Sequence, residues 1–152
     1  MHSLQASAPG RPSLRVVAEC RVLKVRYHVG RDSDAERVYR AEAHLERHLP
    51  SGNVSVVEAQ RWVERIAFAE DIDPPRVVYS PLSRHLEGLA FMDHATIVVG
   101  SKNPTRLTLL HELAHFLGTI GHGPRFRAEL VRLVRTHLSQ QHADFLVQHP
   151  QE

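Results

Sequence analysis

The sequence predicts a single α+β domain, in which a small sheet of three or four strands packs against helices. Apolar residues recur at helical spacing in several stretches, and between residues 75 and 101 short β-branched runs stand between turn formers. The chain has 152 residues, a usual size for one domain with its own core.

We expect a disordered leader over residues 1–14, followed by one domain over residues 15–152. The leader is rich in Ser, Pro and Gly and lacks the apolar segment of a secretory signal, so a cytoplasmic location is the default expectation. No stretch approaches the roughly eighteen apolar residues of a membrane span, which predicts a protein without a membrane partner.

The composition narrows the classes of partner and cofactor. The net charge of +2 and the isoelectric point near 9.0 reflect a small excess of Lys and Arg, too small to predict a nucleic-acid partner. The single Cys20 excludes an internal disulfide and a cysteine-rich zinc module. Histidines and carboxylates are therefore the expected ligands of any metal.

One strand and two helices are expected in the first half of the chain. Residues 22–29, "VLKVRYHV", alternate apolar and polar side chains as a half-buried strand does. Helices are predicted over 34–48 and 56–70, each with apolar residues on one face. Each helix opens with the Ser-x-x-Glu pattern of a capping box: Ser33 with Glu36, and Ser55 with Glu58.

Three further strands are expected in the middle of the chain. The β-branched runs "RVVYS" at 76–80 and "ATIVVG" at 95–100 flank "GLAFM" at 88–92. Together they predict a small antiparallel or mixed sheet. The run 95–100 is the expected edge strand, along which an extended peptide can pair.

The last third of the chain predicts helices. Asn103 is a candidate cap, Pro104 falls in the first turn, and the apolar run continues up to Gly118. Pro124 starts a second helix, whose apolar residues repeat every three to four positions. The apolar cluster 145–147 predicts a short C-terminal helix that docks on the core.

The first of these helices holds the residues that indicate chemistry. His111 and His115 are four positions apart, so they project from one face of a helix and can bind one ion. Glu112 points about 100° around the axis, beside the ion, where its carboxylate can take a proton from metal-bound water. This is the H-E-x-x-H arrangement.

His122 is the expected third ligand. Catalytic zinc uses three protein ligands and keeps one position open for water. Gly121 and Gly123 flank His122, so the chain can fold back toward the helix. We expect His122 to lie on a loop with little burial, and Glu129 and His94 are the alternative third ligands.

The segment "HELAH", followed by "HGPRF", resembles the zincin metallopeptidases over about residues 76–138. The likeness is closest to SprT-like and minigluzincin-type proteins and to uncharacterised small bacterial metallohydrolases with an H-E-x-x-H core. The resemblance implies that zinc is bound by His111, His115 and His122. It also implies that Glu112 is the general base and that Phe126 is structural.

The expected function is zinc-dependent hydrolysis of a peptide bond in a peptide or protein substrate. Two departures from the family pattern bear on this expectation. Only six residues separate His115 from His122, and one cysteine cannot form the zinc ribbon often attached to SprT-like proteins. The alternatives are a metal-stabilised interaction module without catalysis and a DNA-associated SprT-like protease.

Overall fold

A computed structural model describes residues 33–83, 86–118 and 120–148 of the chain. The predicted leader 1–14 and the predicted strand 22–29 lie outside the described residues.

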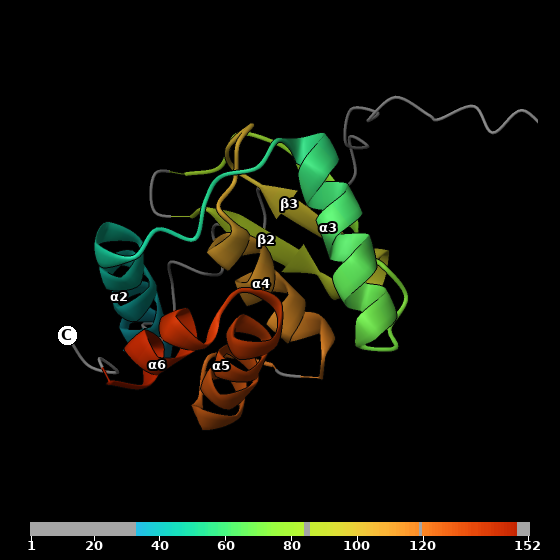
Figure 1. The fold of residues 1–152 in the computed structure, drawn as a ribbon. Coiled ribbons are helices and arrows are strands. Elements are labelled where there is room, and N and C mark those ends of the chain that lie inside the picture. Colours follow the sequence, from blue (N-terminus) through green and yellow to red (C-terminus); the bar gives the residue numbers. More distant parts are fainter. Residues whose placement is uncertain (1–32, 84–85, 119, 149–152) are drawn as a thin grey trace, which may run out of the picture.

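The described residues form a mixed α+β fold, as predicted (Figure 1). Its elements in chain order are α2 Ser33–His48, α3 Val56–Ala69, β1 Arg76–Tyr79, β2 Gly88–Phe91, the 3-10 turn η1 Met92–His94, β3 Thr96–Val99, α4 Arg106–Phe116, α5 Pro124–His137 and α6 Gln140–Gln148. The capping box of Ser55 and Glu58 is present at the start of α3. No helix among the described residues is long and apolar enough to cross a membrane.

The three strands form a mixed sheet with the order β1-β3-β2. β3 runs parallel to β1 and antiparallel to β2. The prediction of an edge strand at 95–100 is therefore wrong. All four residues of β3 are buried, and a strand that is apolar on both faces is stabilised best in the middle of a sheet.

The helix with the H-E-x-x-H motif begins later than predicted. Thr105, not Asn103, is the cap of α4, and its hydroxyl accepts a hydrogen bond from the Thr108 amide at 3.1 Å. The two residues before it bond to the segment before α3 instead: the Asn53 side-chain amide donates to the carbonyl of Asn103 at 2.9 Å, and the Val54 amide donates to that of Pro104 at 3.0 Å. This pairing with the segment before α3 keeps residues 103 and 104 out of the helix.

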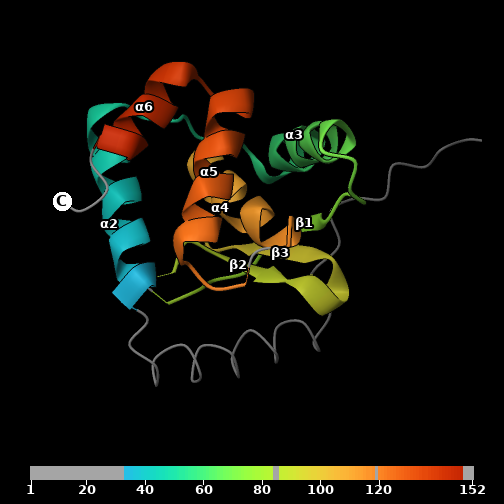
Figure 2. The same ribbon diagram turned by 90° about the horizontal axis from the view of Figure 1, so that it is seen from below.

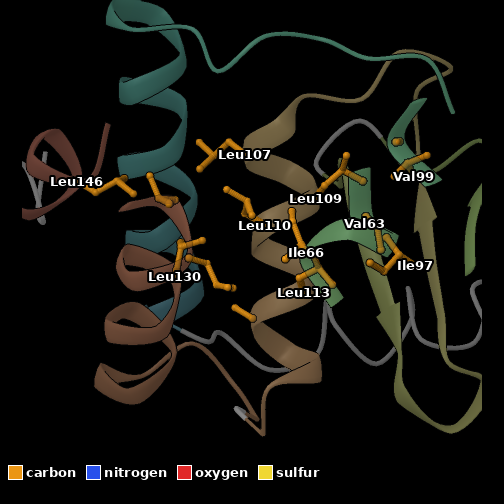
Figure 3. Close-up of a cluster of buried hydrophobic side chains, with 14 of the residues drawn as sticks. Val63, Ile66, Ile97, Val99, Leu107, Leu109, Leu110, Leu113, Leu130 and Leu146 are labelled. Atoms are coloured by element: carbon orange, nitrogen blue, oxygen red, sulfur yellow. The ribbon is translucent and has the colours of Figure 1, made fainter. Parts of the chain in front are cut away.

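Helix α4 lies at the centre of the core. Every residue from Leu107 to Ala114 is buried, so this helix has no solvent face along most of its length. Leu109 and Leu113 point toward Val63 and Ile97, whereas Leu110 points toward α2 and α5 (Figure 3). Packing on both sides fixes the position of the helix and of the histidines on it.

Helix α5 packs on α4, and α6 packs on α5 and α2 (Figures 1 and 2). α5 buries Phe126, Leu130, Leu133 and Val134, at the predicted helical spacing. The predicted docking of residues 145–147 holds in part. Leu146 is buried, but Val147 is 54% exposed.

Candidate metal centre

Three histidines converge at one end of α4. One ring nitrogen from each of His111, His115 and His122 lies within 4.8 Å of the other two. The Nε2 atoms of His111 and His122 are 3.1 Å apart. Two nitrogens at about 2.0 to 2.1 Å from one tetrahedral zinc are separated by about 3.3 to 3.4 Å. The three imidazoles are therefore close enough to bind a metal ion.

The turn after α4 brings the third histidine to the other two. Gly118 and Gly121 both have positive φ, +87° and +78°, which other residues rarely adopt. His122 follows at once and is 1% exposed, so the expectation of little burial for this loop histidine is wrong. A loop side chain can be buried when the chain folds back over a helix end, and local sequence does not reveal this.

Phe126 lies against all three imidazoles. Its ring centroid is 4.8 Å from those of His111 and His122 and 4.6 Å from that of His115. Gly123 is the N-cap of α5 and Pro124 its first residue, so Phe126 is placed within the first turn. These contacts agree with the structural role expected for Phe126 and account for the spacing in "HGPRF".

A carboxylate from α2 orients one of the histidines. Nδ1 of His111 lies 2.6 Å from Oε1 of Glu42 and donates to it, which leaves Nε2 facing His122. Burial lowers the pKa of His111, but the charge and hydrogen bond of Glu42, with nearby Glu112 and Glu87, outweigh it and raise that pKa to about 9. The ring of Tyr39 stacks on His111, with centroids 5.3 Å apart and an angle of 11° between planes.

Sequence reasoning missed Glu42 and Tyr39. Glu42 is separated from His111 by 69 positions, and no motif joins them. The sequence held only a weak sign that Glu42 faces the interior. Glu42 follows Ala41 and lies four positions after Val38, next to the apolar face of a predicted helix.

Glu112 is buried beside the histidines. It is 4% exposed, and burial raises its pKa to about 7, against the opposing charge of His111. With His111 and His115 it lines a cavity of about 180 Å³, whose other side is formed by strand β2 and the turn at Gly121. The carboxylate therefore faces the same space as the imidazoles.

Gly88 in β2 makes room for Glu112. A Cβ atom at this position would lie 3.0 Å from Oε1 of Glu112 and 3.1 Å from a methyl group of Thr108. A larger residue would push against the carboxylate, so β2 helps to set its position.

The alternative third ligands lie outside this group. Glu129 forms an ion pair with Arg132 at 2.6 Å. His94 belongs to the turn η1. Among the described residues, the group able to hold a metal consists of His111, His115 and His122.

Comparison of the chain with protein-family models, curated proteins and solved structures found no match.

Proposed function

We propose that this protein is a zinc-dependent hydrolase that cleaves peptide bonds. The observation that supports the proposal is that two of the three clustered imidazoles, those of His111 and His115, line one small cavity together with the buried Glu112. A purely structural metal site has no need for an acid group facing an adjoining cavity.

The donor set suits zinc. Three imidazoles, which bind a metal in their neutral form, and no thiolate correspond to the ligands of a catalytic zinc site, which keeps one position for water. Zinc bound there would supply Lewis acidity, which polarises a carbonyl and lowers the pKa of bound water to about 7.

Glu112 is the proposed proton carrier. Its carboxylate faces the cavity, so it can accept the proton of the attacking water and pass it to the leaving nitrogen. Burial keeps the pKa of this carboxyl near 7 in the metal-free protein, close to the value that suits transfer in both directions.

Substrate binding is proposed along β2. Gly88, Leu89 and Ala90 line the cavity beside Glu112. Within the described part of the chain, β2 pairs with β3 alone, on one side. An extended peptide could pair with the other side of β2. In this proposal β2 is the edge strand for the peptide, a role that the sequence analysis gave to residues 95–100.

Zinc binding and peptide cleavage test the proposal together. We expect about one zinc per chain, lost in His111→Ala and His115→Ala. Zinc-loaded protein should produce new N-termini in denatured casein or a mixed peptide library, measured by mass spectrometry. Glu112→Gln should retain zinc and reduce the cleavage rate at least about 100-fold, whereas Glu129→Gln should change neither.

Other outcomes assign a different function. Stoichiometric zinc without cleavage of any library peptide would indicate a metal-stabilised interaction module. Undiminished cleavage by Glu112→Gln would exclude this residue as the base.

A further inference from the structure

A second hollow, on the other side of α2, has an apolar floor. Its volume is about 450 Å³, and residues of α2, α5 and α6 line it. The floor includes Val38, Leu130 and Leu146, which belong to three different helices. This volume falls within the range of small-molecule sites in proteins, about 300 to 1,000 Å³. We call this hollow the α2–α5 groove.

Arginines line the walls of the α2–α5 groove. Arg37 comes from α2, and Arg127 and Arg135 come from α5, two turns apart. None of these guanidinium groups forms an ion pair with a residue in 33–83, 86–118 or 120–148. The groove thus combines an apolar floor with three guanidinium groups that form no ion pair among the described residues, although the side chain of Glu42 also borders it.

Two of the arginines lie at the same end. A Cβ atom at Gly123 would be 3.9 Å from a carboxylate oxygen of Asp34, so α2 and α5 begin side by side. Arg37 and Arg127 each follow about one turn later, on opposite walls. The far half of α2 packs on α6 through His44 and Phe145, whose ring centroids are 5.2 Å apart. The floor therefore continues from the two arginines toward α6.

We propose that the α2–α5 groove binds an amphiphilic anion, with its acidic head group between Arg37 and Arg127 and its apolar body along the floor toward Leu146. Guanidinium groups favour carboxylate, sulfonate and phosphate oxygens, and the floor favours an alkyl chain or ring.

Charge argues against two other occupants. Residues 1–32 of the chain carry six Lys or Arg against two acidic residues, so they do not complement the arginines. A second copy of the chain, with net charge +2, is no better match. The groove is a different place from the cavity at Glu112, although Glu42 borders it and also holds His111.

Dodecanesulfonate is a suitable probe. Because sulfonate is a poor zinc ligand, binding of its head group indicates contact with the arginines and not with zinc. Calorimetric titration of the zinc-loaded full chain, below the micellar concentration, should show one site. Decanesulfonate, which is two methylenes shorter, should bind up to roughly 15-fold more weakly, since each buried methylene contributes about 0.8 kcal/mol. Butanesulfonate and dodecyltrimethylammonium should not bind measurably.

Variants locate the site. Arg37→Glu and Arg127→Glu should each weaken dodecanesulfonate binding at least tenfold, whereas Arg125→Glu, on an exposed residue of α5 outside the groove, should leave it unchanged. Unchanged zinc content and an unchanged circular dichroism spectrum would show that each variant is folded. If a variant is not folded, Arg127→Gln is tested in its place. Absence of binding, equal binding of the cationic surfactant, or equal affinity in all variants would overturn the proposal. A dimer that dissociates on Arg127→Glu would instead identify the groove as an interface between copies.

Discussion

Glu42 and His111 form a hydrogen bond of 2.6 Å between two helices that are far apart in the sequence. The carboxylate is 13% exposed and the imidazole 2% exposed, so water competes little for this contact. A carboxylate behind a metal-binding histidine fixes the ring orientation and the nitrogen that faces the metal. Helix α2 therefore supports the candidate metal centre, although none of its residues belongs to the histidine group.

Glu42→Gln should weaken zinc binding about 10-fold to 100-fold, because the neutral amide lacks the negative charge with which the carboxylate stabilises this tautomer of His111. Competition with a chromophoric chelator measures this change. Glu36→Gln is the matched control, since Glu36 is an exposed residue of the same helix. Equal zinc affinity in both variants would show that the orientation of His111 does not depend on Glu42.

Gly88→Ala should lower the rate of the proposed peptide cleavage, and Gly88→Leu should lower it further. A Cβ atom needs the Glu112 side chain to move by a few tenths of an ångström, and the branched side chain of Leu needs a larger displacement. We expect the proposed peptide cleavage to fall in the order Gly, Ala, Leu, with zinc content unchanged because Glu112 is not among the ligands. Measuring kcat and zinc content on the same samples checks this, and zinc loss in proportion to activity would point to damage of the whole centre.

Local patterns were enough to predict most helices. Residues 34–48 and 56–70 were predicted within one residue of α2 and α3, because capping and helical spacing are local properties. The start of α4 was wrong because residues 103 and 104 pair with a segment about 50 positions away. The central place of β3 was missed for the same reason: strand order is decided by tertiary contacts.

The residues of the candidate site that lie near one another in the sequence could be predicted. Those that only the fold brings together could not. Helical spacing places His111 and His115 together, and the glycines near His122 predicted the turn that brings the third imidazole. Glu42, Tyr39 and Gly88 come from elements that only the fold brings to α4. Pairs of this kind leave no trace in spacing or composition.

Glu70 should make the fold sensitive to acid. The hydrogen bond from Arg132, at 2.7 Å, lowers the pKa of Glu70 below its usual 4.5, and that from His137 acts in the same direction. The folded pKa lies below the unfolded one, so the stabilisation is present above about pH 4.5 and is lost as the pH falls through the folded value. These pairs connect the end of α3 to α5.

Thermal unfolding as a function of pH measures this contribution. Glu70→Gln should lower the midpoint by a few degrees at pH 7, since pairs at a protein surface contribute about 0.2–1 kcal/mol each. The difference from the parent should disappear once the pH has fallen below the folded pKa of Glu70. Asp73→Asn, an exposed acidic residue after α3, is the control. A difference that persists at low pH would mean that packing, not charge, accounts for the effect.

His122→Ala should remove most of the zinc affinity and also destabilise the metal-free protein. The imidazole is 1% exposed and packs against Phe126, so its removal leaves a void in the core and should cost about 1–3 kcal/mol. His122→Gln retains much of the side-chain volume, and it should therefore lose zinc with a smaller loss of stability. Glu129→Ala breaks only the pair with Arg132 and should bind zinc as the parent does. Zinc titration and metal-free unfolding of the three variants separate ligation from packing. Normal zinc affinity in His122→Ala together with lost affinity in Glu129→Ala would make Glu129 the third ligand.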